Sequence, residues 1–286
     1  MRLRPQGPFS PAAAARFQET FPAFSAPVEP GMIDLAFPAD DTWATLGVRV
    51  TPDLDLRVVA NPAGVAEDAV RRQVERILSL DVDGTGFAEV GERDPVVGDL
   101  QRRFPGLRPV LFATPYEAAA WALVGHRISM TQGAALLRRL AEELGDRVEI
   151  GGRTLATFPP PQRLATLDPM PGMFLRKVEN LRALGEAALA GDLDADLLRG
   201  MPVDEALNHL RKVPGIGPFS AELILIRGVG TVDFFARETP RIHQAMADAY
   251  DLGPTPPMAK LEAIARAWRP YRSWVTFLLR AASYNR

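Results

Sequence analysis

Hydrophobic residues follow two different spacings in the first hundred residues of the chain. Apolar side chains at every second position, as in Leu54, Leu56 and Val58, are typical of half-buried strands. This alternation and the turn residues around it predict three strands, over residues 32–37, 42–50 and 53–60. Over residues 65–80 the spacing becomes that of an amphipathic helix. We therefore expect a small α+β domain over residues 1–105.

Beyond this region the pattern is helical almost to the end of the chain. Thr114, Pro115 and Glu117 fit a capping box with proline at the first helical position, which marks a helix start. The pattern predicts helices over residues 115–126, 129–144, 161–167, 173–190, 203–212, 218–227, 240–250, 257–267 and 271–283. The connectors are rich in Gly and Pro. We expect an all-α domain over residues 106–286, with the boundary near residues 103–106.

Composition narrows the class of protein. The chain has 286 residues, 47% hydrophobic and 24% charged, which is typical of a globular protein. It has no apolar run of membrane-spanning length and no signal-peptide core at its N-terminus, so we expect a cytoplasmic protein without a membrane partner. The absence of cysteine excludes disulfides, iron–sulfur clusters, Cys-ligated zinc and a thiol nucleophile.

The formal net charge of the chain is −2, whereas a protein that coats nucleic acid over its whole surface would be strongly basic. Any nucleic-acid binding must therefore use a local patch. Over residues 254–286 the only acid is Glu262, against the basic residues Lys260, Arg266, Arg269, Arg272, Arg280 and Arg286. The alternative interpretation of this patch is a solvated helix face.

The most informative motif is a glycine-rich turn between the predicted helices 203–212 and 218–227. Pro214 cannot continue the first helix, and Pro218 suits the first turn of the second. Gly215 and Gly217 allow backbone conformations closed to other residues and let another surface approach the main chain. Free N–H groups at the start of the second helix would bind an anion, such as a phosphate of a polymer. The alternative is an ordinary helical hairpin.

The string from Leu210 to Ala221 resembles the DNA-binding helix-hairpin-helix signature. The chain as a whole resembles the 3-methyladenine DNA glycosylase II (AlkA) family of the helix-hairpin-helix superfamily, through this hairpin, residues 122–129, 172–177 and 225–228, and the tail at 268–274. The resemblance implies a TATA-binding-protein-like (TBP-like) α+β domain, then two helical subdomains flanking a cleft. It also implies a monomer that binds double-stranded DNA, everts a damaged base and hydrolyses the bond from base to deoxyribose.

By the same resemblance, the hairpin would hold a monovalent cation, Na⁺ or K⁺. Its ligands would be the main-chain carbonyls of Arg211, Val213 and Ile216. Such a cation would help to neutralise a DNA phosphate, so the hairpin would need few basic side chains. No other cofactor is expected.

The family's catalytic aspartate has no counterpart here. That position corresponds to Thr239, and its neighbour Glu238 carries the nearest carboxylate. We expect Glu238 either to stabilise positive charge on the sugar or to be a solvated surface residue. Thr239 and Pro240 suit the N-cap and first position of the next helix. Asp233, at the start of this loop, is expected to be structural.

Three further positions match the family's base pocket, namely Phe219, Leu223 and Arg280. Phe219 stands where lyase relatives have their Schiff-base lysine, which implies hydrolysis without lyase activity. Aromatic rings would attract a cationic base, whereas Arg280 would repel it. For Phe219 and Leu223 the alternative is core packing at helical spacing.

The remaining DNA contacts implied by the resemblance are charged or polar. His126 and Arg127 occupy the loop whose side chain fills the gap left by the everted base. The alternative is that His126 caps its helix and Arg127 meets a phosphate. Lys212, Arg237 and Arg241 are expected phosphate contacts. Two function hypotheses follow: a monofunctional DNA N-glycosylase, or a catalytically impaired paralogue that binds distorted DNA. A general DNA-binding module would not need the large helical body.

Overall fold

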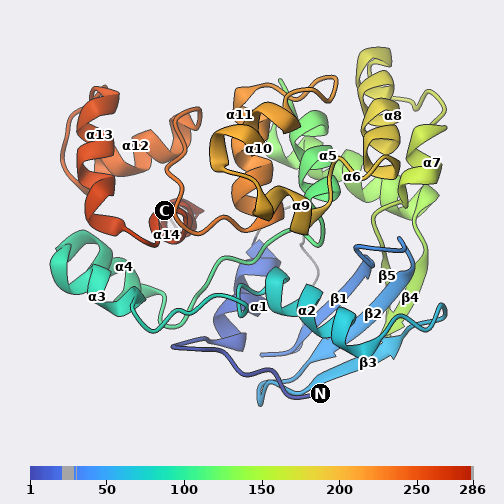
Figure 1. Ribbon diagram of the computed structural model, residues 1–286, viewed down its shortest axis with the longest axis horizontal. Helices are drawn as coiled ribbons and strands as arrows, with labels where there is room; N and C mark the ends of the chain where they lie inside the picture. The colour runs from blue at the N-terminus through green and yellow to red at the C-terminus, as the bar shows by residue number, and fades with distance from the viewer. Residues whose placement is uncertain (21–28, 30, 285–286) are drawn as a thin grey trace.

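The computed structural model describes residues 1–20, 29 and 31–284, and Figure 1 shows its arrangement. The predicted strands are present as an antiparallel sheet in the order β1 (Ile33–Pro38), β2 (Thr45–Val50) and β3 (Leu56–Ala60). β1 is shifted by one residue from its predicted range, and β2 and β3 are shorter than predicted. Ile33 pairs with Val50, and Val48 pairs with Val58. The predicted amphipathic helix is α2 (Glu67–Ile77).

The region expected to be all-α contains a two-stranded hairpin, so that expectation is wrong at residues 147–156. β4 (Arg147–Ile150) pairs with β5 (Arg153–Ala156), and the hairpin packs against the first sheet (Figure 1). Val148 and Ile150 alternate with exposed residues, and Gly151 and Gly152 adopt φ of +59° and +73°, which suits a tight hairpin turn. Each strand has only four residues, too few for the alternation to be distinguished between two helical segments.

All helices predicted for the body are present. They are α5 (Pro115–Gly125), α6 (Met130–Leu144), α7 (Pro161–Ala165), α8 (Leu175–Leu189), α10 (Val203–Leu210), α11 (Pro218–Ile224) with the π-helix η1 (Leu225–Val229), α12 (Pro240–Ala249), α13 (Met258–Ala265) with the 3₁₀-helix η2 (Arg266–Trp268), and α14 (Arg272–Tyr284). Within the described residues, no helix has both the length and the apolar character needed to cross a membrane.

Four helices were not predicted: α1 (Pro11–Thr20), α3 (Phe87–Arg93), α4 (Pro95–Arg103) and α9 (Ala195–Gly200). Two of them begin at a capping aspartate. Asp94 accepts from the N–H groups of Val96 and Val97, and Asp194 accepts from Leu197 at 2.6 Å. These N-cap signals are present in the sequence but precede helices too short to show a clear apolar period.

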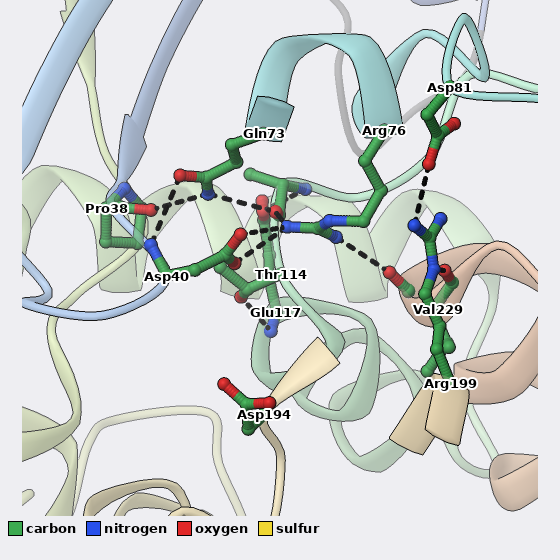
Figure 2. Close-up of polar contacts among 12 residues, drawn as sticks. Pro38, Asp40, Gln73, Arg76, Asp81, Thr114, Glu117, Asp194, Arg199 and Val229 are labelled. Carbon is green, nitrogen blue, oxygen red and sulfur yellow. Dashed lines mark hydrogen bonds and ion pairs between the residues drawn. The ribbon is translucent and has the colours of Figure 1, made fainter. Parts of the chain in front are cut away.

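Figure 2 shows how α2 and the first sheet join the helical body through a polar cluster. The guanidinium of Arg76, whose side chain is only 4% exposed, donates to both carboxylate oxygens of Asp40 at 2.7 Å. It also reaches the carbonyls of Ala113 and Gly228 at 2.8 and 3.0 Å. Gln73 donates to Ala113 as well. One arginine therefore links three separate segments.

A second junction joins α4 to the C-terminal helices. The carboxylate of Asp94 accepts from the Tyr250 hydroxyl at 2.6 Å and from the indole N–H of Trp268 at 3.0 Å. Trp268 is fully buried, so this hydrogen bond satisfies a polar group inside the core. The N-terminal hundred residues thus contact both ends of the helical region. The division at residue 105, the TBP-like assignment and the two subdomains around a cleft stay predictions.

Candidate functional site

The glycine-rich turn is built as a rigid connection between α10 and α11. The side chains of Val213 and Ile216 are buried, and the N–H of Ile216 donates to the carbonyl of Val213 at 3.1 Å. Gly215 has φ of +86°, and a Cβ there would lie 2.5 Å from Nδ2 of Asn180. Gly215 is therefore required both by its backbone conformation and by the close approach of α8.

Gly217 has only one of the two properties expected of both glycines, the open space beside its main chain. Its backbone is extended, with φ of −92° and ψ of −175°, so no left-handed conformation requires glycine there. A Cβ at this position would meet nothing within 4 Å. Among the described residues, the N–H groups of Gly217 and Phe219 donate no hydrogen bond. The start of α11 thus presents free donors beside open space.

Helix α8 contacts both the turn between α5 and α6 and the glycine-rich turn. Lys177 of α8 donates to the carbonyl of Val124, at the end of α5, at 2.6 Å, and burial lowers the pKa of this lysine. Less than one turn further along α8, Asn180 lies against Gly215. α8 therefore fixes the distance between the two turns.

His126 and Arg127 occupy this α5–α6 turn and are both exposed. Arg127 has φ of +60°, which is an uncommon conformation for a residue with a side chain. No side-chain hydrogen bond or ion pair of either residue occurs within the described part of the chain. His126 occupies the C-cap position of α5, but its imidazole makes no cap bond, so that alternative is not supported.

Residues 232–239, here called the active loop, connect η1 to α12 and carry the two candidate catalytic residues. Side chains from neighbouring helices hold this loop. Arg272 donates to the carboxylate of Asp233 at 2.6 and 3.1 Å, which gives Asp233 the structural role that we expected. Ser273 bonds both the N–H and the carbonyl of Phe234.

The second half of the active loop is held by His243 and Glu222. Nε2 of His243 lies 3.0 Å from the carbonyl of Ala236. The carboxylate of Glu222, on α11, accepts from the N–H groups of Arg237 and Glu238 at 3.1 and 2.9 Å. Helix α11, which follows the glycine-rich turn, is thus in direct contact with the active loop.

Glu238 and Thr239 lie at the exposed end of the active loop. Glu238 is exposed, and its carboxylate makes no hydrogen bond or ion pair with the described residues. Thr239 is the N-cap residue of α12 and Pro240 follows at the first position, as predicted. However, the Thr239 side chain makes no cap bond, so the expected capping role of its hydroxyl is wrong. Its carbonyl, by contrast, accepts from Ile242 at 2.9 Å.

Arg241 and Arg280 both contact the first residue of α6, next to the α5–α6 turn. Arg241, at the start of α12, donates to Sδ of Met130 at 2.8 Å, and Arg280 of α14 contacts the same sulfur at 3.3 Å. Met130 is the first residue of α6, three positions after Arg127. The structure therefore brings Arg127, Arg241 and Arg280 into one neighbourhood.

The other predicted residues are distributed around the hairpin. Phe219 is 41% exposed on the first turn of α11, so it is not a core residue, whereas Leu223 is half-buried against the core. Lys212 and Arg211 are exposed on the turn. Arg237, an expected phosphate contact, forms an ion pair with Glu262 of α13 at 2.7 Å, which partly neutralises its charge.

A cavity of about 470 Å³ lies beside the active loop, and sequence reasoning did not find it. Its lining includes Glu222, Asp233, Arg237, Glu262 and Arg266, but none of the three predicted pocket residues. Glu222 is only 5% exposed, and burial raises the pKa of its carboxyl. The available sequence signal for Glu222 was its position as a charged residue within the apolar segment that follows the glycine-rich turn.

Comparison with known proteins was made by sequence and by structure. No family model matches the chain. A DNA-3-methyladenine glycosylase of Bacillus subtilis (strain 168) is 26% identical over 216 residues, which cover 74% of this chain and 71% of the relative. The DNA-3-methyladenine glycosylase 2 of Escherichia coli (strain K12) is 32% identical over 182 residues, covering 62% of this chain and 61% of the relative. The chain thus spans less than two thirds of that second relative.

Solved structures share the fold. The 3-methyladenine DNA glycosylase from Archaeoglobus fulgidus superposes with a TM-score of 0.81 at 23% identity, covering 98% of this chain and 96% of the other. A Clostridium acetobutylicum 8-oxoguanine glycosylase/lyase in complex with double-stranded DNA superposes with a TM-score of 0.60 at 15% identity, covering 85% and 86%. The chain is thus similar in sequence to DNA-3-methyladenine glycosylases and shares its fold with the solved DNA glycosylases.

Proposed function

We propose that this protein is a DNA-repair N-glycosylase that hydrolyses the bond between an alkylated purine and deoxyribose in double-stranded DNA. The names of the sequence relatives support this activity. The observation that carries the proposal is the placement of three elements together. The free amides of the hairpin, the α5–α6 turn with its exposed Arg127, and the active loop with Glu238 are joined through α8 and α11.

DNA would be bound mainly through the main chain. The N–H groups of Gly217 and Phe219 would donate to a backbone phosphate, and Lys212 would add charge from the same turn. The lesion would leave the base stack, because its glycosidic bond is hard to reach inside the duplex. Arg127 and His126 would enter the space that the everted nucleotide leaves.

The reaction would be a simple hydrolysis. The oxygen of a water molecule bonds to C1′ of the sugar and its proton passes to Glu238 or to solvent. The electron pair of the C1′–N bond leaves with the base, which departs neutral if alkylation had made it cationic. Positive charge develops on the sugar, and a nearby carboxylate stabilises it. Glu238 is our candidate for that carboxylate, with Thr239 beside it as a water ligand. Phe219 cannot form a Schiff base, so no strand cleavage should accompany base release.

A monovalent cation would complete the hairpin. The carbonyls of Arg211, Val213 and Ile216 belong to one short turn, and neutral oxygen atoms are suitable ligands for Na⁺ or K⁺. The Val213 carbonyl also accepts from Ile216, which leaves it a second lone pair. When bound, the cation would supply positive charge next to the phosphate. Replacing Na⁺ and K⁺ with a bulky organic cation should weaken duplex binding.

The experiment that tests the proposed function measures free base released from methylated duplex DNA. The parent protein should release 3-methyladenine, and Glu238→Gln should release at least about 100-fold less, because the charge that stabilises the sugar cation is lost. Thr239→Asp tests the alternative. No release by the parent, combined with release by Thr239→Asp, would mean that the protein is a catalytically impaired DNA-binding paralogue.

A further inference from the structure

The side chain of Glu222 is buried without a cationic partner within hydrogen-bond distance. Placing a carboxylate inside a protein costs free energy unless hydrogen bonds compensate for the lost hydration. Its two oxygens are occupied by two successive main-chain N–H groups, those of Arg237 and Glu238. A carboxylate that accepts from two amides in this way fixes the main chain more firmly than one neutral acceptor would.

The active loop depends on such side-chain contacts for its position. Within the described residues, positions 233–238 make no hydrogen bond from main chain to main chain. Ser273 and His243 bond the main chain of Phe234 and Ala236, and Glu222 bonds the main-chain N–H groups of Arg237 and Glu238. Without Glu222, two buried or partly buried donors beside Glu238 would lose their acceptor.

Glu222 also belongs to the helix that carries the hairpin amides. It lies on α11, three residues after Phe219 and five after Gly217. A single short helix therefore joins the predicted phosphate contact to the loop with the candidate catalytic carboxylate. We propose that Glu222 is a positioning residue, which sets the place of Glu238 and Thr239 relative to DNA held by the hairpin. This inference rests on the proposed function.

The distinguishing variant is Glu222→Gln, which keeps the size of the side chain. A glutamine has one acceptor oxygen, and its amide group cannot accept from the second N–H. The matched control is Glu262→Gln. Glu262 lines the same cavity and pairs with the side chain of Arg237, but it touches neither main-chain amide of the loop. Both variants remove one negative charge from the same cavity.

Two measurements separate positioning from a general loss of folding. The first is the single-turnover rate of base release together with the dissociation constant for duplex DNA. We expect Glu222→Gln to slow release by about 10- to 100-fold, because small displacements of a reacting group have effects of this size. The dissociation constant of Glu222→Gln should change less than about twofold, and Glu262→Gln should leave the rate of release at saturating protein unchanged, within an error of about twofold.

The second measurement is amide hydrogen exchange at Arg237 and Glu238, which requires no activity. Exchange there should become about tenfold faster in Glu222→Gln and stay unchanged in Glu262→Gln, while amides in α5 stay protected in both. Unchanged exchange at these two amides would overturn the proposal even if the parent releases no base. Equal losses of release in the two variants, or a loss fully explained by weaker DNA binding, would overturn it as well.

Discussion

At the scale of single residues, the two hairpin glycines have separate physical reasons to be glycine. Gly215 adopts a positive φ and leaves no room for a methyl group beside Asn180, whereas Gly217 is extended and faces open space. Gly215 is therefore needed for the conformation of the turn. Gly217 leaves space for another molecule to contact the main chain.

The pair gives a stability prediction. Gly215→Ala should lower the free energy of unfolding by about 1–3 kcal/mol, because it adds both backbone strain and a steric contact. Gly217→Ala should change it by less than about 0.5 kcal/mol. Urea denaturation of the two variants measures the difference. Equal destabilisation would contradict the conformations described for this turn.

The hairpin was predictable from these glycines and prolines because local backbone chemistry determines it. Glu222 was not, since its role depends on a loop that lies beside it only after folding. The missing cap bond of Thr239 is similar: the residue type and position were predictable, but the direction of its hydroxyl depends on the packing of α12.

At the scale of elements, the first turn of α5 carries a carboxyl group, that of Glu117, with a raised pKa. Thr114 accepts from the N–H of Glu117, and the carboxylate of Glu117 accepts from the N–H of Ala113 at 3.1 Å. Loss of hydration raises the pKa of Glu117 to about 7, although the bond from Ala113 partly offsets this. The residue lies close to the polar cluster that joins α2 to the body (Figure 2).

A pH-dependent effect on stability follows from this carboxyl group. Between its ordinary pKa of 4.5 and about 7, the folded chain binds more protons at Glu117 than the unfolded chain does. The contribution of Glu117 to the free energy of unfolding therefore falls as the pH rises through this window. Glu117→Gln cannot ionise and still offers Ala113 an acceptor. Relative to the parent, the free energy of unfolding of this variant should rise by on the order of 2 kcal/mol between pH 5 and pH 8.

Thermal or urea unfolding of the parent and Glu117→Gln at both pH values checks this effect. Only the difference between the two proteins matters, because other carboxyl groups titrate equally in both. A difference that stays constant with pH would contradict the raised pKa.

The helices of the body were predictable because proline, glycine and capping residues mark their ends. The β4–β5 hairpin was less predictable, because its short strands are stabilised by the sheet of the N-terminal region. Gly47 on β2 allows this approach, since a Cβ there would lie 2.4 Å from Cγ1 of Val148. That contact joins residues a hundred positions apart, which no local pattern reveals.

At the scale of the whole molecule, the charge distribution limits how DNA can be held. The basic C-terminal residues predicted to form a patch are partly neutralised, since Arg272 and Arg269 both pair with Asp233. Arg237, an expected phosphate contact outside that patch, pairs with Glu262. The basic side chains left around the hairpin and the α5–α6 turn are few, chiefly Lys212, Arg127 and Arg241. The main-chain amides that we propose to bind the DNA carry no net charge.

Duplex binding should therefore depend weakly on salt. Each phosphate neutralised by a cationic side chain contributes about −0.9 to the slope of log K against log salt concentration, so three contacts give a slope of about −3. Titration of a labelled duplex at several salt concentrations measures it. A slope steeper than about −7 would mean that a broad basic surface, rather than the hairpin, holds the DNA.

The central claim is that the open side of the glycine-rich turn receives the DNA on which the active loop acts. Gly217→Leu tests it most directly, with Gly200→Leu as the control, because a Cβ at either glycine meets nothing within 4 Å. In a single-turnover assay with methylated duplex DNA, Gly217→Leu should stay folded yet bind the duplex at least about tenfold more weakly and release correspondingly less base. Gly200→Leu should behave like the parent. A folded Gly217→Leu protein that binds the duplex and releases base as the parent does would contradict the claim.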